Sequence, residues 1–401
     1  MTHSLPTFVP PARLLLGPGP SDVAPSVLRA LAAPTLGHLD PKLFEALDQI
    51  RAMLRTLFGT RNAATLAVSG TGTSGMEAVL CNLIEPGDAV LVPVHGYFGA
   101  RVAEIAARCG ADVVRVDGTW GRVSDVAAAR VACQGRRIRV VAVVHAETST
   151  GVREDLEAWR DLSRELGALF VADTVTSLGC IPIDADAHGL DAAWSCTQKG
   201  LSCTPGLAPV TFSERALERI RARSRKVQSF YFDLGLLLDF WGGAHAYHHT
   251  ISSNLLYALH EAARLVLAEG LEQRFAQHSA ASRACVAGLE ALGLSLLVEE
   301  AQRLPQLLAV RIPSDVPDVS VRTRLLQDFG IEIGGGLGPF KGQLWRVGLM
   351  GHGATRRNVT TLLAALGACL RAEGFQPRGD GVAAAERVFS GAERGAASVA
   401  R

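Results

Sequence analysis

The sequence predicts an α/β fold with a large domain, built on a mostly parallel sheet, and a smaller C-terminal α/β domain. The chain has 401 residues, more than one hydrophobic core usually serves. Short apolar runs at 88–94, 138–144 and 168–172 alternate with helical patterns such as the one at 154–166. This alternation is typical of a parallel sheet covered by helices, whose ligands bind beyond the carboxyl ends of the strands.

The domains follow one another along the chain. Residues 1–25 are rich in Pro and Gly and predict an N-terminal arm. Residues 26–265 predict the large domain and residues 266–372 the small one, whereas residues 373–401 mix Gly, Ala and charge and predict a poorly ordered tail. The further elements that we expect are helices at 42–58, 99–109, 123–133, 251–293 and 355–371, and strands at 192–197, 207–212, 306–311 and 343–348.

Composition argues against several classes of protein. The net charge of +1 gives no basic field for nucleic acid. No run of about 18 uninterrupted apolar residues occurs, so we expect no membrane span. The eight cysteines form no CxxC pair and predict reduced thiols, without a disulfide framework or a metal site. Neither end of the chain carries a recognisable targeting signal, so we expect a cytoplasmic protein.

Residues 70–75 read GTGTSG between an apolar run and a helical pattern. Backbone amides at a helix N-terminus, together with small hydroxyl residues, form an anion site, so Gly72 and Thr73 predict phosphate binding. The string also fits the dinucleotide fingerprint GxGxxG, but the next strand ends in the string PVHG and lacks the acid that binds a ribose. A purely structural turn is the remaining alternative.

Lys199 is one of only four lysines among 40 basic residues, and it lies in the uncharged run at 194–200. A lysine amine forms Schiff bases with carbonyl compounds, which arginine cannot easily do. Asp173 directly follows the apolar run at 168–172. A lysine and an acid at the ends of neighbouring strands suit pyridoxal phosphate, because the lysine holds the aldehyde and the acid keeps the ring nitrogen protonated. A loop lysine and a turn or capping aspartate are the plain alternatives.

Arg346 lies in the string QLWRVGL, on an expected strand of the small domain. A guanidinium group matches a carboxylate in two parallel hydrogen bonds, so Arg346 is a candidate for binding a substrate carboxylate. The chain holds 36 arginines, and a surface residue or a structural ion pair is the alternative interpretation.

With these residues in view, the chain resembles the class V pyridoxal-phosphate-dependent aminotransferases, and among them the alanine–glyoxylate and serine–glyoxylate (serine–pyruvate) enzymes. The resemblance runs from residue 14 to about residue 371. It rests on the strings SGTGTSGMEA, HAETSTGV, VADTVTSLGC, SCTQKGLSCTPGLAPVTFS and YHHT. It implies fold type I, pyridoxal 5′-phosphate as cofactor, amino acid and 2-oxo acid substrates, and a homodimer with shared active sites.

The resemblance also implies a role for individual residues. Lys199 would carry the cofactor and move the proton, Asp173 would pair with the pyridine nitrogen, and Arg346 would bind the substrate carboxylate. The other positions carried over are Gly72, Thr73 and Gln198 at the phosphate, Tyr247 and Thr250 at the phosphate of the neighbouring subunit, Phe98 stacked on the cofactor ring, and Thr148 beside its hydroxyl group. Two positions depart from the animal enzymes, which often have Trp where this chain has Phe98 and His where it has Thr73.

The function implied is transfer of an amino group from alanine or serine to glyoxylate or pyruvate. Transfer from (S)-ureidoglycine to glyoxylate is an alternative within the family. A lyase of the cysteine desulfurase type is less favoured, because it needs a cysteine on a mobile loop, whereas Cys180, Cys196 and Cys203 lie in tight or core-like segments. A non-catalytic phosphate-binding protein would need neither Lys199 nor Asp173. The sequence leaves the choice of amino donor open.

Overall fold

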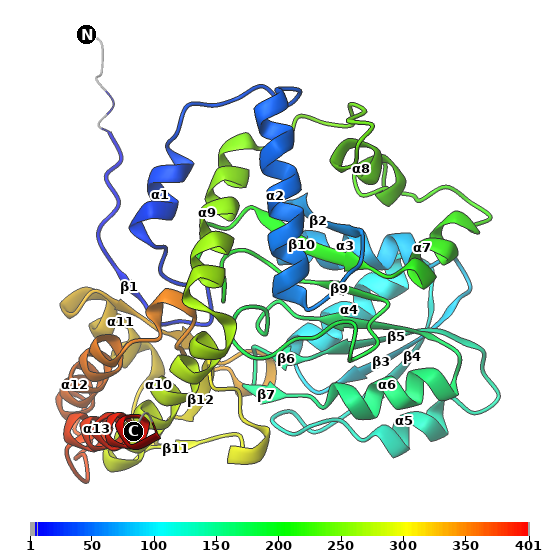
Figure 1. The fold of residues 1–401 in the computed structure, drawn as a ribbon. Helices are drawn as coiled ribbons and strands as arrows, with labels where there is room; N and C mark the ends of the chain where they lie inside the picture. Colours follow the sequence, from blue (N-terminus) through cyan, green and yellow to red (C-terminus); the bar gives the residue numbers. More distant parts are fainter. Residues whose placement is uncertain (1–4, 6, 400–401) are drawn as a thin grey trace.

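The computed structural model describes residues 5 and 7–399, with side chains up to residue 391. Its centre is a seven-stranded sheet with the order β2-β10-β9-β8-β5-β3-β4 (Figure 1). Strand β10 is antiparallel to both of its neighbours, and every other pair in this sheet is parallel. The strands are β2 (Ala64–Ser69), β3 (Ala89–Val94), β4 (Asp112–Asp117), β5 (Ile138–Val144), β8 (Leu169–Asp173), β9 (Ala192–Trp194) and β10 (Leu207–Phe212).

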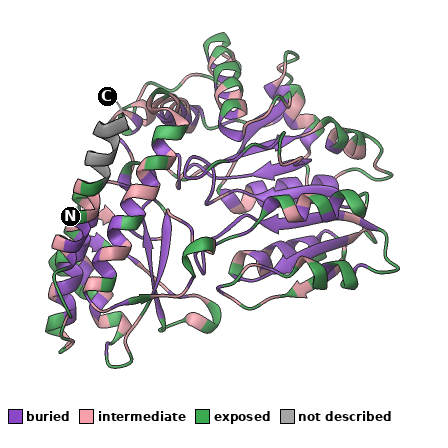
Figure 2. Cartoon of the chain, turned by 60° about the horizontal axis from the view of Figure 1, so that its bottom comes forward, coloured by how far each residue is buried: buried purple, intermediate pink, exposed green. Residues whose placement is uncertain are grey.

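Helices pack against this sheet and bury most of its strands, which Figure 2 shows in purple, whereas the edge strand β4 stays largely exposed. Helix α2 (Pro41–Phe58) illustrates the cause, because one face of it repeats apolar residues at helical spacing and buries them in the core, namely Leu43, Leu47, Ile50, Leu54 and Leu57. The Asp40 carboxylate accepts a hydrogen bond from the Lys42 N–H and caps its first turn. The other helices before residue 250 are α1 (Pro25–Leu31), α3 (Gly72–Leu83), α4 (Tyr97–Arg108), α5 (Val126–Ala132), α6 (Leu156–Glu165), α7 (Glu214–Arg221) and α8 (Leu234–Trp241).

A second core lies in the C-terminal part, around an antiparallel sheet with the order β11-β12-β15-β14. The expected strands at 306–311 and 343–348 are β12 (Leu307–Arg311) and β15 (Leu344–Gly348), and the expected closing helix is α12 (Arg356–Ala372). The remaining elements here are β11 (Ser295–Leu296), β13 (Ile331–Glu332), β14 (Gly334–Gly335) and α11 (Asp318–Asp328). The exact domain boundaries at residues 25, 265 and 372 stay predictions.

The long helical stretch expected at 251–293 is two helices, α9 (Ser253–Glu269) and α10 (Leu271–Ala291). Gly270 separates them with a φ of +88°, which side chains with a Cβ rarely adopt. In the described part of the chain, no helix combines the length and hydropathy of a membrane span. Within the same residues, no three His, Cys, Asp or Glu side chains gather as metal ligands would.

The expectation of a poorly ordered tail after residue 373 is wrong for the described residues. Residues Gly381–Val399 form helix α13, which packs beside α10 (Figure 1). Ala384 and Ala385 are buried there, and a Cβ on Gly288 of α10 would lie only 2.8 Å from the Gly381 carbonyl oxygen. Small residues allow this close approach of two helices, but in a sequence they resemble a weakly hydrophobic tail. Residues 400 and 401 lie outside the description.

The N-terminal arm is partly built into the fold. Strand β1 (Leu14–Leu15) pairs in parallel with β13, and Leu16 belongs to the C-terminal core. A few residues later, the Ser21 hydroxyl donates to the Lys199 carbonyl oxygen at 2.7 Å. The arm therefore joins the C-terminal part to the segment that carries Lys199. Residues 1–4 and 6 of the expected arm lie outside the description.

Candidate active site

Asp173 and the lysine segment meet at the carboxyl edge of the central sheet. Asp173 is the last residue of β8, and its register partner on the parallel strand β9 is Trp194. The chain continues from Trp194 through residues 195–198 to Lys199, so both residues follow from strands that end side by side. The side chains of Asp173 and Lys199 are buried, with 2% and 8% of their surface exposed. The interpretation of Lys199 as a solvated loop residue is therefore wrong.

The Lys199 amine lies against the N-terminal arm. Its Nζ atom donates a hydrogen bond to the Pro18 carbonyl oxygen at 2.5 Å. Burial lowers the pKa of the Lys199 ammonium group, and the charge of Arg346 lowers it further. The turn that carries it is held from α10, because Arg274 donates to the carbonyl oxygens of Gly200 and Gly179. An amine with a lowered pKa loses its proton more readily and becomes a nucleophile.

Asp173 is a buried acid without an ion-pair partner among the described residues. Burial raises its pKa to about 7. The backbone N–H of Val175 opposes this shift by donating to Asp173 Oδ1 at 2.8 Å, and the Trp194 side chain and the charge of Lys199 oppose it too, whereas the negative charge of Glu147 adds to it. The contact with Val175 is the turn hydrogen bond that the capping alternative expected. A cationic group placed beside the carboxylate would relieve the cost of its burial.

The predicted phosphate turn lies against both of these segments. Helix α3 starts at Gly72, and no side chain caps its first turn. A Cβ on Gly72 would lie 3.1 Å from Val175 Cγ2 and 3.2 Å from Cys196 Cβ, so the turn reaches the residues that follow Asp173 and precede Lys199. The Gln198 side-chain amide forms no hydrogen bond in the described part of the chain, and its Oε1 atom, which can only accept, is buried. The free backbone amides and the Nε2 group of Gln198 can donate hydrogen bonds to an anion.

Phe98 lies at the start of α4, where Glu147 holds the helix in place. The buried Glu147 carboxylate accepts hydrogen bonds from the backbone N–H groups of Phe98 at 3.1 Å and Gly99 at 3.2 Å. It thus caps α4 from the short strand β6 (Ala146–Glu147), which pairs with β7 (Val152–Arg153). The next residue, Thr148, shares a hydrogen bond with the Thr176 hydroxyl. Sequence analysis missed Glu147, although an acid in the otherwise uncharged string after His145 was a signal.

Arg346 reaches the site from the C-terminal part. It lies on β15 with 7% of its surface exposed. Its Nε donates to the Gly335 carbonyl oxygen at 2.7 Å, and its Nη1 donates to the Thr148 carbonyl oxygen at 3.3 Å. Burial lowers the pKa of Arg346 to about 10, while Glu147 opposes the shift. Arg346 has no salt bridge within the described residues, so neither alternative, surface residue nor ion pair, describes it. A guanidinium carries five N–H bonds, and those not used here are available to a carboxylate.

Tyr247 and Thr250 stand apart from the other predicted residues. Both are exposed in the protomer, Tyr247 by 62%, on the segment between α8 and α9. The Tyr247 ring lies 5.1 Å from that of His38, and neither residue contacts another predicted site residue through a hydrogen bond or ring contact in the described part. The neighbouring His249 lies 3.3 Å from Ser69 Oγ at the end of β2. The structure therefore leaves these two side chains outside the site of their own protomer.

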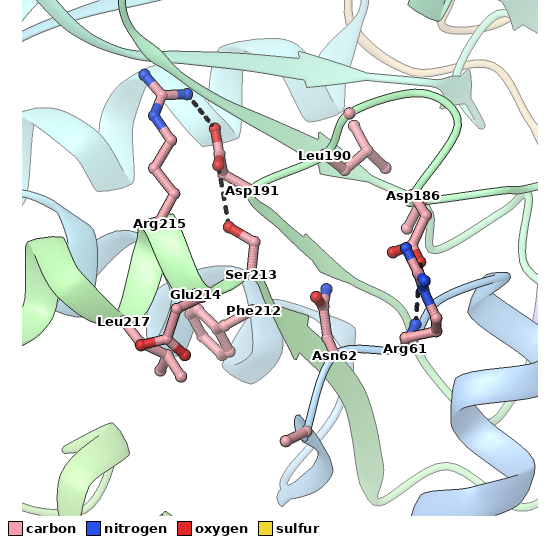
Figure 3. A pocket seen from close by; sticks show the side chains of 13 residues that line it. Arg61, Asn62, Asp186, Leu190, Asp191, Phe212, Ser213, Glu214, Arg215 and Leu217 are labelled. Carbon is pink, nitrogen blue, oxygen red and sulfur yellow. Dashed lines mark hydrogen bonds and ion pairs between the residues drawn. The ribbon is translucent and has the colours of Figure 1, made fainter.

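A cavity of about 650 Å³ lies at the opposite edge of the sheet, where β9 begins and β10 ends (Figure 3). None of the predicted site residues lines it. The charged side chains there are paired, Arg61 with Asp186 and Arg215 with Asp191. We do not assign chemistry to this cavity.

The model of the family described as Aminotransferase class-V matches residues 25–340. The chain belongs to the class V aminotransferase family. Among curated relatives, an (S)-ureidoglycine–glyoxylate transaminase of Bacillus subtilis is 39% identical over 96% of this chain and 98% of its own. An alanine–glyoxylate aminotransferase of Drosophila melanogaster is 38% identical over 90% of this chain and 93% of its own.

Solved structures of the family superimpose on most of the chain. An alanine–glyoxylate aminotransferase from Nostoc sp. matches with a TM-score of 0.90 and 48% identity, covering 92% of this chain and 98% of its own. The ureidoglycine–glyoxylate aminotransferase from Bacillus subtilis matches with a TM-score of 0.93 and 40% identity, covering 96% and 99%. NifS-like proteins, at 12–15% identity, share the fold alone. The predicted α/β architecture of fold type I is confirmed.

Class V aminotransferases of this fold use pyridoxal phosphate, and the residues of this chain fit that cofactor. The buried amine of Lys199 and the unpaired acid Asp173 lie at one sheet edge. The uncapped start of α3 and the unpartnered Gln198 amide lie beside them. The substrates of such an enzyme are amino acids and oxo acids, and Arg346 is the cationic group that faces this site from the C-terminal part. Sequence analysis assigned no role to Pro18, whose GPGPS string was the available signal.

Proposed function

We propose that this aminotransferase transfers the amino group of a small amino acid, alanine or serine, to glyoxylate, with pyruvate as a further acceptor. The observation that carries the proposal is the burial of an amine, an acid and a guanidinium around one sheet edge. The relatives named for glyoxylate transamination support the acceptor. Donor and acceptor both carry a carboxylate beside the reacting carbon, so a single guanidinium serves both half-reactions.

Pyridoxal phosphate, when bound, supplies an electron sink for the bond that breaks at the substrate α-carbon. Lys199 would hold the cofactor aldehyde, and its amine, once freed, would accept the proton that leaves the substrate α-carbon. Asp173 would pair with the pyridine nitrogen and keep it protonated, which would give this buried acid, free of salt bridges among the described residues, a cation in direct contact. Arg346 binds the α-carboxylate with the N–H groups that it does not spend on Gly335 and Thr148.

The remaining predicted residues position the cofactor in this proposal. Gly72, Thr73 and Gln198 bind its phosphate at the start of α3, as the uncapped first turn supports. Phe98, fixed by the Glu147 carboxylate, stacks on the ring. Thr148 lies beside the ring hydroxyl.

The amino donor is tested by a substrate panel with glyoxylate as acceptor. Alanine and serine are expected to give the highest kcat/KM values. (S)-Ureidoglycine is the second candidate donor, because the Bacillus subtilis transaminase named for it covers 96% of this chain. Highest turnover with ureidoglycine would select that candidate, and turnover of no amino acid with glyoxylate would contradict the proposal.

We infer that the active unit is a homodimer in which Tyr247 and Thr250 reach the phosphate of the partner's site. Their exposure in the protomer, together with the YHHT string, supports this role. Mixing Lys199→Ala and Thr250→Ala subunits tests it, because a heterodimer would hold one site with both lesions and one intact site. Activity should return on mixing at limiting cofactor. Heterodimers that form without regaining activity would contradict shared sites.

We infer a cytoplasmic location from the cysteines, all eight of which are free and buried. The same burial argues against a cysteine desulfurase, since no cysteine lies exposed on a loop within the described residues. Burial also raises the pKa of the Cys196 thiol beside Lys199 to about 12, so it stays protonated. Sulfide release from cysteine would contradict this inference, and cell fractionation with an antibody tests the location.

A further inference from the structure

One charged side chain beside the proposed cofactor site has no role in the scheme above. Arg101 lies on α4 and donates a hydrogen bond from Nη1 to Thr73 Oγ1 at 3.1 Å. Its Cζ atom lies 5.0 Å from the centroid of the Phe98 ring. The same guanidinium therefore contacts two predicted cofactor residues that belong to different helices, Thr73 on α3 and Phe98 on α4.

Helix geometry fixes the Arg101 side chain over two aromatic rings. Tyr97 and Phe98 precede it by four and three residues, which places all three on one face of α4. Its Cζ atom lies 5.2 Å from the Tyr97 ring centroid, within the range of a cation–π contact. The start of α4 is itself fixed by the Glu147 carboxylate. The guanidinium is thus held in place by the fold before any ligand binds.

The hydrogen bond from Arg101 leaves the hydrogen atom of the Thr73 hydroxyl free to be donated. A hydroxyl group has one hydrogen to donate and two lone pairs that accept. Arg101 occupies a lone pair, so the Thr73 hydrogen remains available to an acceptor, and no hydrogen bond uses it in the described part of the chain. Because Thr73 is the second residue of an uncapped helix, this hydrogen lies in the same turn as free backbone amides. An anion at this turn would accept it.

The charge balance of the site also points to Arg101. The proposed phosphate ligands Gly72, Thr73, Gln198, Tyr247 and Thr250 are all uncharged. A phosphate monoester carries about −1.5 to −2 charges at pH 7. No carboxylate forms an ion pair with Arg101 among the described residues, and the first turn of α3 holds no acidic residue. Its positive charge therefore has no ion-pair partner in the part of the protomer that the structure describes.

We propose that Arg101 is the cationic positioning residue of the phosphate site. It orients the Thr73 hydroxyl so that its hydrogen points to the phosphate, and it supplies the positive charge that the other ligands lack. Through its contact with Phe98 it also links the phosphate turn to the wall on which the cofactor ring stacks. This inference rests on the proposed cofactor site.

The test compares pyridoxal phosphate with pyridoxal, which lacks the phosphate. The full-length protein is freed of cofactor with hydroxylamine, and dissociation constants are measured from the absorbance change on binding. In Arg101→Met, binding of pyridoxal phosphate should weaken by roughly 10-fold or more, whereas binding of pyridoxal should change by less than about twofold. Arg101→Lys should recover part of the lost affinity for pyridoxal phosphate, because lysine restores the positive charge but not the planar set of guanidinium N–H donors.

Arg108 provides a matched control on the same helix. Its side chain is 77% exposed and pairs with Glu104, so Arg108→Met should leave both dissociation constants unchanged. In a Thr73→Val background, Arg101→Met should lose much of its effect, because the hydroxyl that it orients is gone. Rising salt should weaken binding of pyridoxal phosphate more in the parent than in Arg101→Met.

Equal weakening of pyridoxal phosphate and pyridoxal in Arg101→Met would make Arg101 merely structural and overturn the inference. Unchanged binding of both ligands would overturn it as well. In either case the parent still binds pyridoxal phosphate on Lys199, so the proposed function stands. A parent protein that fails to bind pyridoxal phosphate at all would overturn the proposed function and this inference together.

Discussion

Two buried aspartates stand at opposite edges of the seven-stranded sheet, Asp173 at the end of β8 and Asp191 just before β9. Burial raises the pKa of both. Asp191 accepts hydrogen bonds from the Phe170 N–H, the Ser213 hydroxyl and the Arg215 guanidinium, the last two drawn in Figure 3. Asp173 accepts one from the Val175 N–H and has no ion pair within the described residues.

The two ends of the sheet therefore differ in whether their buried charges are paired. We call the end at Asp191 the structural edge and the end at Asp173 the chemical edge. At the edge of Asp191, a cavity of about 650 Å³ is lined by charges that already have partners. At the edge of Asp173, the Lys199 amine and the Arg346 guanidinium bond only backbone carbonyl oxygens. Charges that the fold buries without a counter-ion are available to a ligand, so unpaired charge locates this site better than cavity volume does.

The largest effect expected at the chemical edge is that of Lys199→Ala. Transamination should fall by more than about 10³-fold, because the proton-transferring amine is lost. Lys226→Ala is the control, since Lys226 is an exposed lysine away from the predicted site residues. Borohydride reduction followed by peptide mass mapping should find the cofactor on Lys199 in the parent protein. Cofactor bound to another lysine would contradict the assignment.

Exchange of each aspartate for asparagine tests the difference between Asp173 and Asp191. Asp173→Asn should keep the fold and lose about 10²-fold or more in kcat, because a neutral amide cannot hold the pyridine nitrogen protonated. Asp191→Asn should cost about 1–3 kcal/mol in the free energy of unfolding and leave the turnover of the folded protein unchanged. Steady-state kinetics and urea unfolding of both variants measure this. Near-normal turnover of Asp173→Asn would contradict the catalytic role of Asp173 and leave it only the role of a turn residue.

Arg346→Lys should raise KM for the amino donor and for glyoxylate alike. A point charge replaces a fork that binds a carboxylate through two hydrogen bonds, so an increase of roughly 10-fold is expected. The dissociation constant of the cofactor should stay the same, because the predicted contact is to the substrate. Equal KM values in variant and parent would contradict this role. So would faster turnover with aspartate or glutamate than with alanine or serine, which would indicate a second cationic pocket.

The smallest effect expected is a pH dependence of stability in the cofactor-free protein. Burial raises the pKa of Asp173 to about 7, above the value of about 4 in an unfolded chain. The folded protein then keeps a proton that the unfolded chain loses, so stability falls as pH rises from about 4 to about 7. Asp173→Asn should therefore show a smaller fall in Tm than the parent between about pH 5 and about pH 8. Parallel Tm curves would contradict the raised pKa.

The local sequence pattern was sufficient to predict much of the fold and the candidate site residues at the ends of strands. The apolar runs that predicted β3, β5 and β8 are buried strands. A short continuous apolar run is typical of a strand that is buried on both faces, whereas a helix shows apolar residues at every third or fourth position. The same pattern put Asp173 at a strand end, and the rarity of lysine singled out Lys199. The sequence pattern did not predict helix α13, because its Gly and Ala residues become buried only through contact with α10.

Alternation of strands and helices along the chain was enough to place Asp173 at the carboxyl end of a parallel strand, because such alternation implies the direction of the strands. The order of the strands and the residues around this end follow from the tertiary structure. Pro18 and Lys199 meet across 181 residues, and Arg346 and Thr148 across 198. Glu147 caps a helix that begins 50 residues before it. Such contacts leave no periodic signal in the chain, because they depend on how two cores dock and on which buried polar groups then find partners.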